Sequence, residues 1–186
     1  MLLWLPDKLA NEIVREAKTI KLEKVSYKGW QKRYGRSIGL RAPGMFVEQV
    51  RRTVLRTGGT LLEFPTWSTY LSQACHRCGS KKKKTLGERY HECECGVFVQ
   101  RDIYSAYLAS HIDEQTKCLS ITQSSEEWAG VEVRLSAEME RVQARAKEGE
   151  QFPRSMGLSA RGGVRLPKSL QVTVSENAEG KTSVGS

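Results

Sequence analysis

Apolar residues near the start of the chain recur first at helical and then at strand spacing. Leu9, Ile13 and Ala17 lie four residues apart after Pro6, which predicts a helix over this stretch. The residues that follow, 19–25, alternate apolar and polar positions and predict a strand. The chain therefore opens with one helix and one strand.

A second helix and a second strand are predicted further along. Pro43 marks the helix start, and the Gly58–Gly59 pair marks its end. Its apolar positions recur at helical spacing: Phe46, Val50 and Val54. Residues 60–64 then form a short apolar run that predicts a strand ending at Pro65. The mixture of helices and strands indicates an α/β fold.

Two further helices are expected in the second half of the chain. Asp102 stands where a helix through Tyr107 and Leu108 would begin. Residues 130–147 form the other helix, whose apolar positions again share helical spacing: Leu135, Met139, Val142 and Ala146. Beyond it, residues 148–186 are rich in Gly, Ser, Lys, Arg and Glu, which predicts a disordered tail.

Positive charge is concentrated in the first three fifths of the chain. Of 186 residues with a net charge of +9, residues 1–112 carry 20 Lys and Arg against 10 Asp and Glu. Residues 113–186 carry 10 against 11. The asymmetry favours a polyanion partner for the first part. The alternative is a solvated basic surface without a partner.

The cysteines and the absence of long apolar runs indicate an intracellular protein. No segment reaches the roughly 20 apolar residues of a membrane span, and Met1–Leu5 is too short for a signal-peptide core. We expect a cytoplasmic, nucleoid-associated location without membrane contact. In a reducing compartment, cysteines are metal ligands or free thiols rather than disulfides.

Four cysteines form a cluster with the spacing of a structural zinc site: Cys75, Cys78, Cys93 and Cys95. Thiolates are the ligands that tetrahedral zinc prefers, and four of them leave no open position for catalysis. His91 or His76 could replace one cysteine, and idle thiols are the remaining alternative. Cys118 lies far away in sequence, and we expect it to be a partly buried apolar residue.

Basic and aromatic side chains beside these features are candidates for nucleic-acid contact. On the zinc hairpin they are Arg77, Lys81, Lys82, Lys83 and Lys84. In residues 26–42, expected to be a loop, they are Lys28, Trp30, Lys32, Arg33 and Arg36. The lysines and arginines suit phosphate contact, and the aromatic rings suit base stacking. The alternative is that Trp30 and Tyr34 pack on the sheet.

Two carboxylates stand out by position, although spacing alone leaves their roles open. Glu23 lies near the end of the first predicted strand, and Asp102 follows the zinc hairpin at a helix start. Carboxylates brought together can hold Mg²⁺ for phosphodiester cleavage. Alternatively, Asp102 caps its helix and Glu23 is an ordinary surface residue.

The order of these motifs resembles the C-terminal part of insertion-sequence OrfB transposases, also called TnpB proteins, which are relatives of compact type V CRISPR effectors. The resemblance covers roughly residues 8–110. It rests on IKLEKVSYKGWQKRYG, RAPGMFVEQVRR, GGTLLEFPTWSTYLSQACHRCGSKKKK, HECECG and QRDIYSAYLA. It implies an RNA-guided DNA endonuclease with a RuvC-type, RNase H-like domain interrupted by a zinc ribbon. Glu23 matches the family's middle metal-binding acid, Asp102 the last, and the four cysteines the ribbon ligands.

The chain departs from this family at its start, where the family's first catalytic Asp lies in an Asp-x-Gly strand. No Asp-x-Gly occurs in this sequence. We therefore expect an incomplete RuvC-type fragment over residues 1–112, with the ribbon at about 72–98, a helical extension over 113–147 and a tail. It would bind DNA, with guide RNA as a further candidate partner, and would hold Mg²⁺ poorly and cleave negligibly by itself.

Three other functions remain open from the sequence. A separately encoded N-terminal half could supply the missing Asp and complete an active enzyme. The chain could also be an unrelated zinc-ribbon interaction module, or a decayed remnant without function. A neighbouring reading frame that encodes an Asp-x-Gly segment would favour the first of these.

Overall fold

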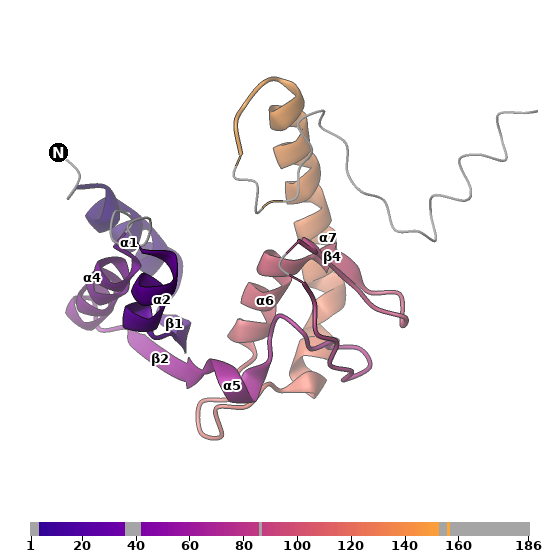
Figure 1. The fold of residues 1–186 in the computed structure, drawn as a ribbon, viewed down its shortest axis with the longest axis horizontal. Coiled ribbons are helices and arrows are strands. Elements are labelled where there is room, and N and C mark those ends of the chain that lie inside the picture. Colours follow the sequence, from indigo (N-terminus) through magenta and orange to yellow (C-terminus); the bar gives the residue numbers. More distant parts are fainter. Residues whose placement is uncertain (1–3, 36–41, 86, 153–155, 157–186) are drawn as a thin grey trace, which may run out of the picture. The chain divides into compact units, whose positions relative to one another are not determined.

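The chain folds into a mixed α/β arrangement with two small sheets. The computed structural model describes residues 4–35, 42–85, 87–152 and 156 (Figure 1). The chain divides into two compact units, one formed by residues 1–71 and 105–124 and the other by 72–104 and 125–186. No helix in the described part of the chain combines the length and the apolar character needed to cross a membrane.

Helix α1 (Trp4–Glu16) confirms the first predicted helix. Ala10 and Val14 are buried, and they lie one position further along than the predicted face. Leu9 is 48% exposed, and Ala17 lies beyond the helix end. Of the apolar positions that predicted the helix, Ile13 is partly buried and packs against the core formed by Ala10 and Val14. Two apolar stripes overlap in this helix, and packing against the rest of the unit decides how far each is buried.

The first sheet is a parallel pair, β1 (Thr19–Lys24) and β2 (Thr60–Pro65), as the two predicted strands anticipated. Thr19 lies opposite Thr60, and Lys24 lies opposite Pro65. Ile20 belongs to the buried core together with Val14 and the helix that precedes β2. A parallel pair needs a crossover connection, and the described part of the chain between the strands contributes two helices to it.

Residues 26–42 were predicted to be a loop, and this was wrong for the first part. They contain helix α2 (Tyr27–Tyr34), whose N-cap Ser26 accepts a hydrogen bond from the Gly29 N–H through its side chain. Gly35 ends the helix with φ of 57°. No residue of α2 is buried, so the sequence contains no apolar stripe that could have revealed the helix.

Helix α4 (Pro43–Arg56) agrees with the prediction, with proline in its first turn and Val50 and Val54 buried. The chain then turns sharply into β2 through Gly58, whose φ is 71°. A Cβ on Gly59 would lie 2.6 Å from the Lys18 carbonyl oxygen, so only glycine fits there. This close approach lets the Thr60 N–H donate to the Lys18 carbonyl and start the strand pairing.

Residues 105–124 complete the first unit. They include the C-terminal half of α6 (Arg101–Ser110), which confirms the helix predicted after the zinc hairpin. From β1, the Lys21 ammonium donates to the carbonyl oxygens of Ser110, at 2.9 Å, and Ile112, at 2.6 Å. A lysine at the carbonyl end of a helix satisfies acceptors that have no partner within the helix. Short helix α5 (Thr66–Thr69) follows β2 in the same unit.

The second unit is built from a short hairpin and a long helix. Strands β3 (Tyr90–Glu92) and β4 (Phe98–Gln100) pair antiparallel. Buried Tyr104 and Trp128 form an edge-to-face pair with ring centroids 5.5 Å apart. Apart from the cysteine cluster, these aromatic rings supply the apolar centre of the unit.

Helix α7 (Ile121–Lys147) starts earlier than the predicted start at residue 130. Its first two turns bury Ser124 and Trp128 and otherwise expose polar residues, so they do not repeat the apolar pattern of the later turns. Most of residues 148–186, which were predicted to be disordered, lie outside the described residues.

Candidate metal centre and nucleic-acid surfaces

Each cysteine pair lies on a tight turn that ends in a glycine. In the first turn the Gly79 N–H donates to the Cys75 carbonyl oxygen at 3.0 Å, and Gly79 has a φ of 67°. In the second, the Gly96 N–H donates to the Cys93 carbonyl oxygen at 2.9 Å, with a φ of 93°. The second pair has one intervening residue instead of two, and its turn is one residue shorter. Both turns aim two thiols at the same point.

The structure brings together the four predicted metal ligands. The four Sγ atoms all lie within 4.8 Å of one another. Cys75 Sγ lies 3.5 Å from Cys95 Sγ, and Cys78 Sγ lies 3.4 Å from Cys93 Sγ. A zinc ion with Zn–S bonds of about 2.3 Å requires sulfur atoms about 3.8 Å apart. The cluster therefore has the size of a tetrahedral zinc–thiolate site.

The surroundings of the sulfurs suit a thiolate cluster. All four cysteines are free thiols rather than disulfides. The Ser80 hydroxyl lies 3.0 Å from Cys78 Sγ, and with the Ser80 backbone N–H it lowers the pKa of the Cys78 thiol to about 6. Desolvation instead raises the pKa of Cys95 to about 12. A bound metal cation would offset the unfavourable free energy of a thiolate that is shielded from water.

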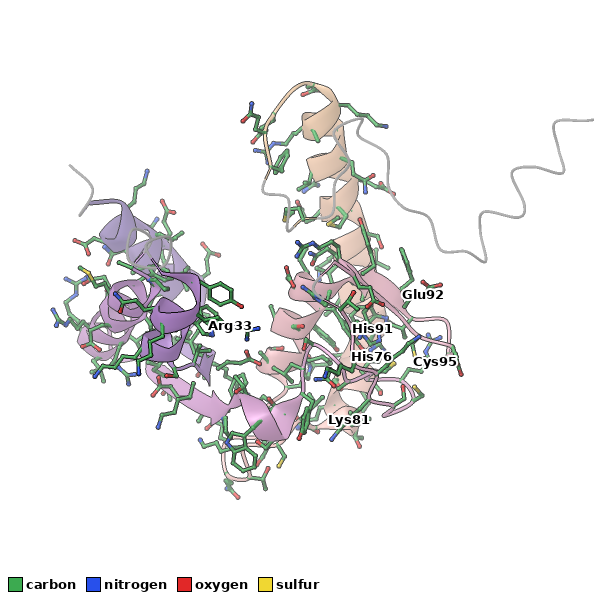
Figure 2. The ribbon with its side chains drawn as sticks, in the orientation of Figure 1. Arg33, His76, Lys81, His91, Glu92 and Cys95 are labelled. Carbon is green, nitrogen blue, oxygen red and sulfur yellow. The ribbon has the colours of Figure 1, made fainter. Side chains whose placement is uncertain are left out.

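Neither histidine joins the metal-binding group in the described part of the chain. His76 is buried, with Nδ1 2.8 Å from the Tyr104 hydroxyl. His91 Nδ1 lies 2.8 Å from the Lys84 ammonium, and burial together with that positive charge lowers the pKa of His91 to about 4 (Figure 2). Both rings flank the cluster, while the sulfur atoms of the four cysteines form the only metal-competent group among the described residues.

The basic side chains of the ribbon divide into exposed and internal ones. Lys81, Lys82 and Lys83 are exposed. Lys84 is half-buried, where it donates to the Ser72 carbonyl oxygen at 3.0 Å, and desolvation lowers its pKa. Arg77 is exposed but uses one guanidinium N–H to donate to the Cys95 carbonyl oxygen at 3.0 Å. Lys84 and Arg77 thus help to hold the ribbon together.

Helix α2 presents a second basic surface, in the first unit, together with exposed aromatic rings. Trp30 is 43% exposed and Tyr34 is 48% exposed, so both rings are accessible to a partner. The Arg33 guanidinium lies 5.6 Å from the Tyr34 ring centroid (Figure 2). Lys28 and Lys32 are also exposed. The remaining predicted contact residue of this segment, Arg36, lies outside the described residues.

Glu23 occupies the carboxyl-terminal end of β1, opposite Phe64 of β2. Its side chain is exposed to solvent. Partial burial nevertheless raises the pKa of its carboxyl group above the ordinary value. Ligands of parallel sheets commonly bind at the carboxyl ends of the strands. Glu23 is therefore an exposed acid with a raised pKa, at a position suited to ligand binding.

Asp102 lies in the first turn of α6, in the second unit. The capping hydrogen bond at this helix start comes from another side chain, because Gln100 Oε1 accepts from the Ile103 N–H at 2.8 Å. One carboxylate oxygen of Asp102 lies 3.3 Å from Arg101 Nε. Asp102 thus has a cationic neighbour and an exposed carboxylate.

One surface residue is more exposed than the sequence suggested, and another was not singled out from the sequence. Cys118 is exposed rather than partly buried, because it belongs to a turn in which the Asp113 carboxylate accepts from the Thr116 N–H. Trp67 in α5 is 75% exposed and was not singled out. The polar residues around this tryptophan, in the sequence PTWSTY, were the available signal.

The geometry defines a four-cysteine metal centre of zinc-ribbon type on a basic hairpin. Residues 44–108 match the family model described as Cas12f1-like, TNB domain. The match covers about a third of the chain and includes all four cysteines and Asp102, whereas Glu23 lies before it. The resemblance to TnpB and compact type V effector proteins is thereby confirmed over this stretch. No curated protein matches the chain.

Proposed function

We propose that this chain is a zinc-stabilised nucleic-acid-binding module, the C-terminal portion of a transposase-like, RNA-guided DNA endonuclease. The observation that carries the proposal is the convergence of four sulfurs within 4.8 Å on a hairpin that exposes Lys81, Lys82 and Lys83. The Cas12f1-like match over the same hairpin supports it.

Zinc is structural in this proposal. The two strands of the hairpin have three residues each, and isolated two-stranded hairpins are marginally stable at best. Zinc binding by small finger peptides contributes about 10–16 kcal/mol of apparent free energy at neutral pH. That is ample to order the hairpin and fix the positions of its lysines.

Two surfaces contact nucleic acid in this proposal. The ribbon lysines and Arg77 bind phosphates without reading sequence. Helix α2 adds Lys28, Lys32 and Arg33 for phosphates and Trp30 for base stacking. DNA is the proposed partner, and guide RNA is a second polyanion that the same chemistry accommodates.

Residues 1–112 would form the C-terminal part of a RuvC-type, RNase H-like nuclease domain. In that role Glu23 and Asp102 would serve as two of three acids that hold Mg²⁺. Carboxylate oxygens are the hard ligands that Mg²⁺ prefers, but this chain supplies only two of the three acids. Because the set is incomplete, we expect negligible DNA cleavage by this polypeptide alone.

A second candidate is an active Mg²⁺-dependent endonuclease completed by a separately encoded N-terminal half. The position of Glu23 at the carboxyl end of a parallel strand favours it, because ligands of parallel sheets commonly bind at that end. The test is nicking of supercoiled DNA in Mg²⁺ by the purified chain. If the purified chain nicks DNA, and if Asp102→Asn and Glu23→Gln each abolish the nicking, the proposal that the chain alone is inactive is wrong.

The test of nucleic-acid binding is the salt dependence of affinity for a single-stranded oligonucleotide. Replacing Lys82 and Lys83 with glutamine should weaken binding and reduce the slope of log K against log salt by about 1.4. The matched control replaces Arg134 and Lys147, two exposed residues of α7, with glutamine. It removes the same amount of positive charge from a position outside the ribbon. Equal losses in both variants would mean that net charge, not the ribbon, drives binding.

A further inference from the structure

The two sides of the cysteine cluster differ in their exposure to solvent. Cys75 is fully buried, and His76 beside it is buried as well. Cys78 is exposed, and Cys93 is partly exposed. Thiolates are the reactive form of cysteine, and water and dissolved reagents reach them on the exposed side. That side is therefore where a metal centre of this kind is most open to attack.

The buried side is enclosed by aromatic rings. The His76 backbone N–H, directly after Cys75, donates to the Tyr104 hydroxyl at 2.8 Å. The His76 ring lies 4.6 Å from the Trp128 ring, measured between centroids. Tyr104 and Trp128 are themselves buried. Packing of this kind holds Cys75 in place without any contribution from the exposed side.

On the exposed side, the Ser80 hydroxyl contacts two sulfur atoms. Ser80 Oγ lies 3.0 Å from Cys78 Sγ and 3.6 Å from Cys93 Sγ. A thiolate carries no proton, so with the cluster in its metal-binding form the hydroxyl is the donor and the sulfurs are the acceptors. One serine side chain thus links a ligand of the first turn to a ligand of the second.

The backbone of Ser80 belongs to the same arrangement. Its carbonyl oxygen accepts from the Cys75 N–H at 3.0 Å, and its own N–H donates to Cys78 Sγ. Gly79, with a φ of 67°, turns the chain so that Ser80 follows directly behind the first cysteine pair. The backbone therefore fixes the position of Ser80 independently of its side chain, so a substitution here changes the hydroxyl and little else.

We propose that Ser80 is a positioning residue of the metal centre, whose hydroxyl orients and shields the exposed thiolates of Cys78 and Cys93 when zinc is bound. The inference rests on the zinc site of the proposed function and adds to it a residue that is not itself a ligand. Ser80 also directly precedes the exposed lysines of the ribbon, Lys81, Lys82 and Lys83. The residue that orients the exposed thiolates thus stands at the base of the proposed phosphate-binding segment.

Loss of the hydroxyl should weaken zinc binding and make the exposed thiolates more reactive. Residues that hydrogen-bond to metal ligands typically change metal affinity by about 10- to 100-fold when they are replaced. Ser80 is exposed, so water replaces part of the lost hydrogen bond, and we expect a loss of about tenfold. A hydrogen bond to a thiolate also lowers its nucleophilicity, so Cys78 should react faster without it.

The experiment compares Ser80→Ala with Ser80→Thr in the full chain. Zinc affinity is measured by competition with a chelator of known affinity, and alkylation of the zinc-loaded chain by iodoacetamide is followed at each cysteine by mass spectrometry. Ser80→Ala should bind zinc about tenfold more weakly, and Cys78 should be alkylated faster while Cys75 stays protected. Ser80→Thr keeps a hydroxyl at the same place and should restore both properties.

Ser72→Ala is the matched control, because Ser72 is also exposed and joins the ribbon through its backbone carbonyl, which accepts from Lys84 Nζ. It should bind zinc as the parent chain does. Equal zinc affinity and equal alkylation in Ser80→Ala and Ser72→Ala would overturn the inference and leave the zinc site standing. Faster alkylation of all four cysteines in Ser80→Ala would also overturn it, because the serine would then serve only the fold. A parent chain that binds no zinc would overturn both the inference and the zinc site.

Discussion

At the scale of single residues, glycines determine where the chain can turn closely enough to build its sites. Gly79 and Gly96 have positive φ values immediately after a cysteine pair. Gly59 admits the Lys18 carbonyl oxygen, which begins the pairing of β1 with β2. In both units, then, a residue without Cβ controls the local backbone geometry.

Gly59→Ala should destabilise the first unit. Its Cβ would lie 2.6 Å from a backbone oxygen and 3.2 Å from the Val54 side chain, so the strand start must shift. Overpacking of this kind costs about 1–3 kcal/mol. The free energy of unfolding is measured by urea denaturation. Hydrogen exchange of the backbone amides in β1 and β2 then locates the loss of stability.

Gly130→Ala is the control for that substitution. Gly130 is exposed within α7 with open space around its Cβ position, so alanine should stabilise the helix by about 0.5–1 kcal/mol. Stability of Gly59→Ala equal to that of the parent chain would show that the close approach in the structure is wrong.

At the scale of elements, the spacing of apolar residues predicted the helices and strands that bury one side, and it missed the helical segments that bury few or no residues. Apolar residues alternate along β1 and β2 and recur at helical spacing along α4, because one side of each element packs against the core. Helix α2 has no buried residue, so nothing in its pattern distinguishes it from a loop. Ser26 at its N-cap and Gly35 at its C-cap were the local signals. The start of α7 was missed for a related reason, since its first turns expose mostly polar residues.

Replacing Trp30 and Tyr34 with alanine should leave stability unchanged and weaken binding to single-stranded DNA. No residue of α2 belongs to the buried core, so the core stays intact in this variant. Each stacked base is worth about 1–3 kcal/mol, so we expect a loss of roughly tenfold or more. Fluorescence anisotropy with a labelled oligonucleotide measures it.

Trp67→Ala provides the comparison, because that ring is even more exposed but lies on α5. If the double variant of α2 binds as tightly as the parent chain while Trp67→Ala weakens binding, the stacking surface lies on α5 rather than on α2.

At the scale of the whole molecule, the two units rely on different sources of stability. The first has an aliphatic core formed by Ala10, Val14, Ile20, Val50 and Val54. The second gathers four cysteines and a few aromatic rings around a short hairpin. The cysteine spacing made this metal centre predictable from sequence. The division into units was not predictable, because it depends on which contacts α6 and α7 make.

Removal of zinc should therefore unfold the ribbon selectively. After chelation, amides of β3 and β4 should exchange at the rate of an unstructured peptide, while those of β1 and β2 keep their protection because their core needs no metal. Hydrogen exchange on the full chain with and without chelator distinguishes the two outcomes. Loss of protection throughout the chain would contradict the independent stability of the first unit.

The most direct test of the central claim is the zinc content of the purified chain, measured by native mass spectrometry. The structure predicts one zinc ion per chain, lost in Cys78→Ser and retained in Cys118→Ser, whose thiol is exposed and outside the cluster. A chain that carries no zinc but keeps the protected amides of β3 and β4 would contradict the claim.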